Sequence, residues 1–153
     1  MNSRITVGII AGLIAGVIFG LMMTMMNAPD GKPMMAMVAQ VVRSDSLVVG
    51  WLYHLFNSAV IGAIFGWLLG NRVSGIGAGL LWGGLYGVLW WILGGLILMP
   101  LFLGMSPLAP LMMEPMRPVA ISSLVGHIFY GLILGAAFSF LSRREVSPAT
   151  TEV

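Results

Sequence analysis

Four long apolar segments constrain the fold of this chain more than any other feature. They span approximately residues 5–28, 47–69, 76–99 and 119–141. Each is long enough to cross about 30 Å of hydrocarbon as a helix, which takes about 20 residues. Only 8% of the residues are charged, against about 25% in an ordinary soluble domain. The sequence therefore predicts an all-α, integral membrane four-helix bundle, with residues 1–153 forming one transmembrane domain.

The segments between the spans carry residues that interrupt helices. "NAPDGKP" follows the first span, "GNRVSG" separates the second from the third, and "MSPLAPLMMEPMRP" follows the third. Proline cannot continue a helix because it lacks a backbone N–H. Residues 142–153 read as a polar tail. The first span is too long for a signal-peptide core and "MNA" is a poor cleavage site, so we expect it to be retained.

The basic residues give a weak orientation signal. An even number of spans puts both termini and the "GNRVSG" turn on one side of the membrane. That side has four basic residues, namely Arg4, Arg72, Arg143 and Arg144. The other side has three, namely Lys32, Arg43 and Arg117. Basic residues favour the cytoplasmic side, so both termini are expected there and the two longer loops outside. The net charge of +2 is too small to indicate nucleic acid, and a chain without cysteine excludes disulfides and thiolate metal sites.

The chain contains an internal repeat. "GIIAGLIAGVIFG" (residues 8–20) matches "GIGAGLLWGGLYG" (residues 75–87) at seven of thirteen positions, and "HLFNSAVIGAIFGWLL" matches "HIFYGLILGAAFSFLS" at six of sixteen. The units cover about residues 5–70 and 72–142. Because each unit holds two spans, the sequence predicts two parallel repeats with a pseudo-twofold axis along the membrane normal.

Small residues recur at every fourth position in each span. Four residues turn a helix by slightly more than one revolution, so such a series forms a nearly straight stripe. Helices in lipid are held by close packing, which small side chains permit. We expect these stripes to pack the bundle; they comprise Gly8, Gly12, Gly16 and Gly20, then Ser58, Gly62 and Gly66, then Gly75, Gly79, Gly83 and Gly87, and finally Gly131, Gly135 and Ser139.

The two histidines occupy equivalent positions in the repeat. His54 and His127 each head a small-residue stripe, and each lies within about two turns of the expected start of its helix, towards the outer face. An ionisable residue inside a span is a functional hypothesis by default. Neutral imidazole binds haem iron, chlorophyll magnesium, zinc or copper. The structural alternative is a hydrogen bond from each ring to a backbone carbonyl, a serine, Asn57 or interfacial water. Proton handling is a third interpretation, and all three stay open.

The methionines are distributed on one side only. Of the thirteen, all except Met1 lie at the expected outer ends of spans or in the outer loops, in "LMMTMMNAP", "PMMAMVAQ", "MPLFLGM" and "LMMEPM". Thioethers are soft ligands suited to Cu(I), so this set could bind copper beside the histidines. Methionine is also a flexible apolar filler at interfaces. The aromatic residues at the same ends are expected to be interfacial anchors; they are Trp51, Tyr53, Trp90, Trp91 and Tyr130.

No pattern indicates an enzyme. The carboxylates Asp30, Asp45 and Glu114 lie outside the spans, and neither a nucleotide loop nor an HExxH motif is present. The first expectation is a non-enzymatic structural or accessory subunit in the lipid bilayer, forming a homo-oligomer or joining a larger membrane complex. The second is a haem- or metal-binding protein, possible metals including copper, that uses His54 and His127. The third, a small transporter or channel, lacks a polar lining.

Two stretches carry a resemblance to a known group. "GLLWGGLYGVLWWILGGLILMPLFLGMSP" and "SLVGHIFYGLILG" resemble the small four-span bacterial membrane proteins of the YagU-like and related uncharacterised families. Those proteins share glycine-rich odd spans, a Met-Pro-x-x-x-Gly-Met close to the third span and a Gly-His start to the fourth. The resemblance implies a four-helix fold in the bacterial inner (plasma) membrane, and it implies no activity.

Overall fold

The computed structural model describes residues 3–145, and within that range it is helical without strands. The long helices are α1 (Ser3–Met25), α3 (Leu47–Leu69), α4 (Ile76–Trp90) and α7 (Arg117–Glu145). The third of these continues through a π-helix, η1 (Trp91–Leu98), into α5 (Met99–Phe102). The short segments are α2 (Met34–Val41), α6 (Ala109–Met112) and a 3₁₀ turn, η2 (Glu114–Met116).

Four helical stretches are long and apolar enough to cross a membrane, as the sequence predicts. They are Ser3–Met25, Leu47–Leu69, Ile76–Phe102 and Glu114–Arg143. Large apolar side chains cover the outside of these helices; Leu21 is 54% exposed, Leu52 65% and Trp67 66%. A soluble monomer rarely exposes so much apolar surface. The structure therefore supports a multi-pass membrane protein.

The helix ends differ from the expected ones by a few residues. The first helix stops at Met25 instead of 28, and the last begins at Arg117 instead of 119. His127 therefore lies almost three turns from the start of α7, deeper than the two turns expected. The expected tail is still helical through Glu145, and residues 146–153 lie outside the described part.

The third span contains a local distortion that its proline explains. Pro100 has no N–H to donate to the carbonyl of Leu96, four residues earlier. That carbonyl accepts instead from the backbone N–H of Leu108, at 2.7 Å. The helix just before Pro100 widens into the π-helix, a rare form that often marks functional sites. The helix thus continues three residues beyond its expected end at 99.

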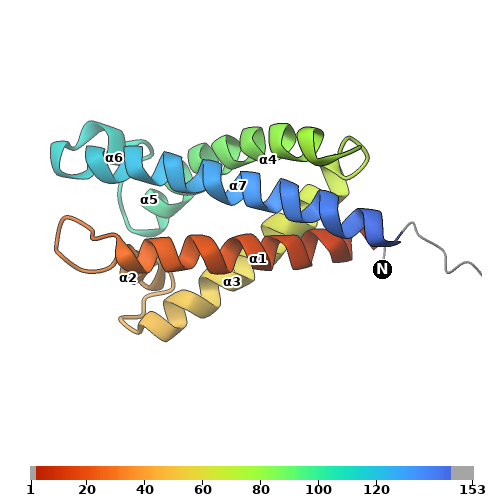
Figure 1. The fold of residues 1–153 in the computed structure, drawn as a ribbon. Coiled ribbons are helices and arrows are strands. Elements are labelled where there is room, and N and C mark those ends of the chain that lie inside the picture. Colours follow the sequence, from red (N-terminus) through yellow and green to blue (C-terminus); the bar gives the residue numbers. More distant parts are fainter. Residues whose placement is uncertain (1–2, 146–153) are drawn as a thin grey trace, which may run out of the picture.

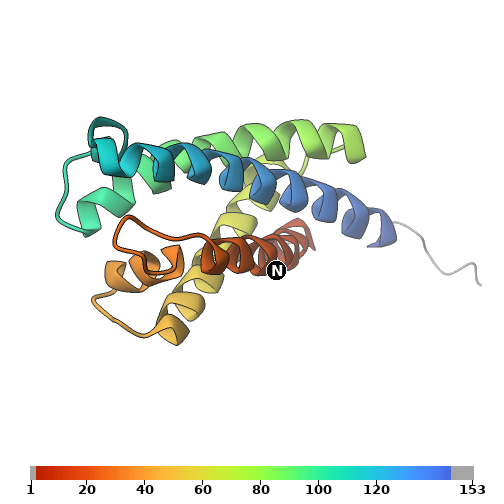
Figure 2. The ribbon, with the colours of Figure 1, turned by 60° about the vertical axis from the view of Figure 1, so that its left-hand side comes forward.

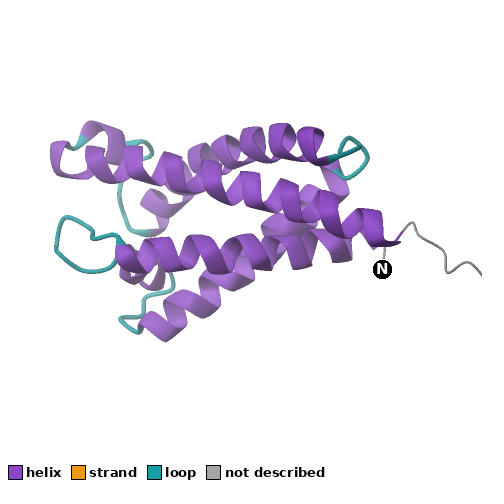
Figure 3. Cartoon of the chain, in the orientation of Figure 1, coloured by secondary structure: helices purple, strands orange, loops and turns teal. Residues whose placement is uncertain are grey.

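The long helices pack as two pairs, α1 with α3 and α4 with α7, and the pairs meet mainly where α1 contacts α7 (Figures 1 and 2). Figure 3 shows loops at both ends of the molecule. The end that carries α2, α5 and α6 is called the loop end here. The start of α1 and the end of α7 lie together at the opposite end, called the terminal end (Figure 1).

Within each pair the two helices touch backbone to backbone along the predicted small residues. A Cβ added at Gly12 would overlap the carbonyl oxygen of Ser58, and one added at Gly83 would overlap that of Gly131. The same overlap with partner-helix backbone occurs at Gly8, Gly62, Gly66, Gly79, Gly87 and Gly135. The stripes therefore face each other within a pair, an arrangement that the sequence left undecided.

The ends of the stripes contact side chains instead of backbone. Gly16 faces the Ser58 side chain and Gly20 faces Trp51, while Gly75 faces Arg143. The buried hydroxyls of the stripes bond to backbone carbonyls: Ser58 to His54, and Ser139 to Gly135 and Gly75. Such bonds satisfy buried hydroxyl groups without holding the helices apart.

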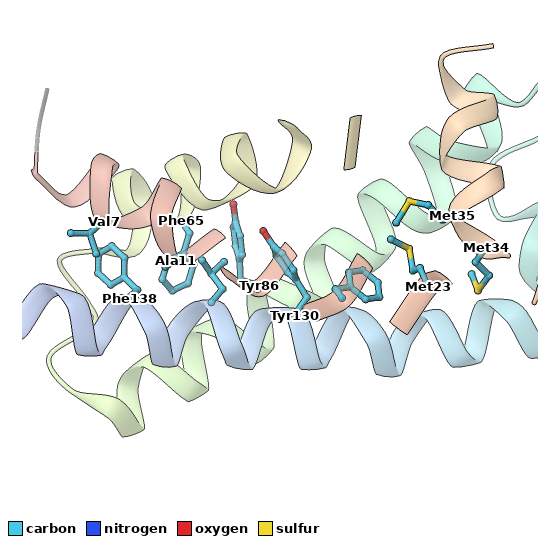
Figure 4. Packing of buried hydrophobic residues seen from close by; sticks show 12 residues of the cluster. Val7, Ala11, Met23, Met34, Met35, Phe65, Tyr86, Tyr130 and Phe138 are labelled. Carbon is cyan, nitrogen blue, oxygen red and sulfur yellow. The ribbon is translucent and has the colours of Figure 1, made fainter. Parts of the chain in front are cut away.

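Aromatic side chains fill the space between the two pairs. The rings of Phe65 and Phe138 lie 5.5 Å apart, centre to centre, and both are fully buried. The Tyr86 hydroxyl donates to the carbonyl of Ile61 at 2.7 Å, and the Tyr130 hydroxyl donates to that of Ser58 at 3.2 Å. Figure 4 shows both tyrosine hydroxyls pointing to the same side, with the methionines beyond them. These contacts tie the second pair to α3.

Gly83→Ala is expected to lower the free energy of unfolding by about 1–3 kcal/mol, the usual cost of forcing extra volume into a packed contact. Gly77→Ala, on the same helix, is the matched control, because its Cβ meets nothing within 4 Å. Thermal unfolding in detergent measures both. Equal melting temperatures for Gly83→Ala and Gly77→Ala would contradict the packing described here.

Candidate functional site

A cavity of about 390 Å³ lies at the loop end, between the two helix pairs. Its lining comes from α1, α2, α3, α7 and the π-helix with α5, and is largely apolar. Pockets of this size and character hold small ligands in many proteins. The cavity is therefore the candidate functional site.

The cavity begins where the aromatic filling ends. Phe65, Tyr86 and Phe138 close the space between the pairs towards the terminal end. Beyond Tyr130 the lining includes seven flexible methionines, and α2 packs against α3 at Gly50. The widened π-helix contributes Gly94 and Gly95 to the wall. Residues without side chains at these positions leave the cavity space unfilled.

His54 is held across the first helix pair. Its side chain is buried, and Nε2 lies 2.9 Å from the carbonyl oxygen of Gly16 on α1. A carbonyl only accepts, so Nε2 carries the proton of the neutral ring. Nδ1 then holds a lone pair, and it makes no hydrogen bond with any described residue. His54 thus fastens α3 to α1 with one nitrogen and keeps the other available.

His127 is held within its own helix. Its Nδ1 lies 2.7 Å from the carbonyl oxygen of Ser123, and the Ser123 hydroxyl lies 3.3 Å from the same nitrogen. The shorter contact, to an acceptor, requires the proton on Nδ1. Nε2 therefore holds the lone pair, and no hydrogen bond to it occurs among residues 3–145. The hydrogen bond to a carbonyl that the sequence offered as the structural alternative is thus made by one nitrogen of each ring.

The structure brings the two histidines to one place. Both rings pack edge-on against the Phe19 ring, with centres 5.8 Å away for His54 and 5.1 Å for His127. Both also line the cavity. The two equivalent residues are nevertheless anchored differently, His54 to a carbonyl of the neighbouring helix and His127 to a carbonyl of its own helix. The repeat pattern, which treats the two histidines alike, did not indicate this difference.

Seven of the thirteen methionines line the same cavity. They come from α1 and the residue after it, α2, α5, the loop after α5 and the 3₁₀ turn, namely Met23, Met26, Met34, Met37, Met99, Met105 and Met116. Met25 and Met112, by contrast, are 84% and 73% exposed. The one-sided methionine distribution in the sequence thus becomes a convergence of thioethers in the structure.

Among residues 3–145, no charged side chain lines the cavity. In the described part of the chain, no three of His, Cys, Asp or Glu come together as a metal-binding group. General acid–base chemistry needs a positioned proton donor and acceptor near a reacting group, and the only ionisable groups at the wall are imidazoles and phenols. The arrangement is suited to binding.

Several residues in or beside the cavity wall have a role that the sequence did not reveal. Tyr130 was expected to be an interfacial anchor, but it is only 3% exposed and its hydroxyl bonds to α3. Trp91 donates its indole N–H to the carbonyl of Ala120 at 3.0 Å, which ties the π-helix to α7. Pro100 is the one signal that could have indicated the widened helix.

Comparison of the chain with protein-family models, with curated proteins and with solved structures finds no match. The resemblance to the YagU-like families therefore stays a prediction from the sequence. A functional assignment has to rest on the geometry of the cavity and on the chemistry of the side chains that line it.

Tyr130→Phe is expected to lower the free energy of unfolding by about 0.5–1.5 kcal/mol, because it removes one buried hydrogen bond and leaves the shape unchanged. Tyr53→Phe is the control, since the Tyr53 hydroxyl has no hydrogen bond to any described residue. Chemical or thermal unfolding in detergent compares them. A larger loss for Tyr53→Phe than for Tyr130→Phe would be inconsistent with the bond to Ser58.

Proposed function

We propose that this protein is a non-enzymatic, four-span membrane protein that binds a small ligand in the cavity at its loop end. The carrying observation is that both histidines line one cavity, each with one nitrogen fixed to a carbonyl and the other uncommitted. The ligand would use the two nitrogen lone pairs that the described residues leave without a hydrogen bond.

We further propose that the two sequence repeats form parallel, pseudo-twofold-related halves. Support comes from contacts at aligned positions: α1 meets α3 as α4 meets α7, along the same small residues. Phe65 and Phe138 are aligned with each other in the repeat, and their rings touch. Two equivalent residues in contact are what a twofold axis between the halves requires.

The proposed location is the bacterial inner membrane, with both termini in the cytoplasm and the cavity on the outer side. The apolar outer surface of the long helices supports burial in lipid. The start of α1 and the end of α7 lie at the same end, as an even number of spans requires (Figure 1). The bias of basic residues favours that end for the cytoplasm.

A ligand-binding role accounts for more than a packing role does. The glycine contacts explain how the helices stay together, as a structural or accessory subunit would need. They do not explain the cavity, nor the second nitrogen of each imidazole ring, which makes no hydrogen bond with any described residue. Conduction is disfavoured because Phe65, Tyr86 and Phe138 fill the path to the terminal end.

The absence of natural cysteine allows a direct test with single-cysteine variants. Ser122→Cys places a thiol at the cavity wall, whereas Ser139→Cys places one in the buried contact between α4 and α7. A membrane-impermeant thiol reagent added outside intact cells is expected to label only Ser122→Cys. That labelling should be blocked in Gly95→Phe/Ser122→Cys, where the added ring fills the cavity beside Ser123.

Ser122→Cys that reacts only from the cytoplasmic side, in inverted vesicles, would reverse the proposed orientation. Ser122→Cys that resists labelling from both sides, as Ser139→Cys is expected to do, would contradict an open cavity.

A further inference from the structure

We propose that the ligand of this cavity is a soft, monovalent metal ion of the Cu(I) class, bound by methionine thioethers together with the free imidazole nitrogens. This inference rests on the proposed binding function and names its ligand class. It is carried by the orientation of the donor atoms, by the charge of the cavity and by the position of the methionines.

The donor atoms match a metal site in their orientation. A histidine that binds a metal almost always donates its other ring N–H to a carboxylate, backbone carbonyl or water, which fixes the ring and its tautomer. His54 does so to Gly16, and His127 does so to Ser123. In both rings the remaining lone pair belongs to a side chain that lines the cavity. Both imidazoles therefore already have the tautomer and the second hydrogen bond of a metal-binding histidine.

The charge of the cavity selects the kind of ion. Calcium and magnesium bind oxygen ligands, mostly carboxylates, and structural zinc sites use four ligands from Cys, His or carboxylates. The described cavity wall offers no Asp, Glu or Cys. An ion with a single charge has the smallest desolvation cost in such surroundings. Neutral thioether and imidazole ligands suit Cu(I).

The methionines lie where such an ion would need them. Met23 is one turn from Phe19 on the same face of α1, and Phe19 contacts both imidazoles. Met23 is 7% exposed and Met34 is 8% exposed, so these thioethers are turned inward. Figure 4 shows Met23, Met34 and Met35 gathered beyond the tyrosines. Filler alone would not require thioethers from five separate segments to converge on one cavity.

The test titrates the full-length protein in detergent with Ag⁺, and with Cu⁺ kept reduced by ascorbate, against a competing chelator. We expect one tight site for both ions. Met23→Leu keeps the volume of the side chain but removes its sulfur, and His127→Phe removes the free nitrogen without breaking a bond between helices. Each is expected to weaken Ag⁺ binding at least about tenfold.

Met25→Leu is the matched control, because Met25 lies on the same helix and is 84% exposed. It should bind Ag⁺ as the parent protein does. Thermal unfolding without metal is measured for all variants, so that a loss of binding is attributed only to variants that stay folded. If His127→Phe unfolds, Met23→Leu together with Met26→Leu decides the question.

Three results would overturn the inference. The first is equal Ag⁺ affinity in Met23→Leu and Met25→Leu. The second is tighter binding of Zn²⁺ than of Cu⁺. The third is a haem Soret band in protein purified from native membranes. If Ser122→Cys is labelled from outside but the protein binds no metal, the metal inference fails and the proposed ligand-binding cavity stands. If Ser122→Cys is not labelled, the proposed binding function itself fails.

Discussion

The rest of the structure depends on the backbone contact between helices of the same pair. In a bilayer the surrounding lipid is as apolar as the side chains, so helices associate through close van der Waals packing. Gly12 against Ser58 and Gly83 against Gly131 bring the backbones together so closely that not even a methyl group fits. Because this contact needs no large side chains, the aromatic residues are left to fill the space between the pairs. They fill it at one end only.

The histidines stand where the packed part of the molecule meets the cavity. His54 belongs to the small-residue stripe, and its bond to Gly16 continues the contact between α1 and α3 by one further step. The same ring lines the cavity with its other nitrogen. One ring can therefore serve both packing and binding, because one nitrogen holds the helices together and the other is available to a ligand. His127 achieves the same through Ser123 on its own helix.

Much of this arrangement could be predicted because it depends on periodicity. The lengths of the apolar runs place the four long helices to within a few residues, and the spacing of Gly8, Gly12 and Gly16 identifies the packed face. Which stripes contact each other could not be predicted, because contact within a helix pair and contact between the two pairs both fit the same spacing. The π-helix was also missed, because it depends on the N–H of Leu108 reaching the carbonyl that Pro100 leaves free. The gathering of methionines and histidines around one cavity was missed as well, because these residues come from segments far apart in the sequence.

The central claim is that nitrogen and sulfur ligands from distant parts of the chain meet at one ion. Copper K-edge X-ray absorption of the Cu(I)-loaded protein tests it most directly, because nitrogen and sulfur neighbours give distinct distances, about 2.0 and 2.3 Å for borderline metals. We predict a mixed shell of nitrogen and sulfur. A shell of nitrogen or oxygen alone would contradict the claim, because the thioethers of the cavity would then play no part in binding.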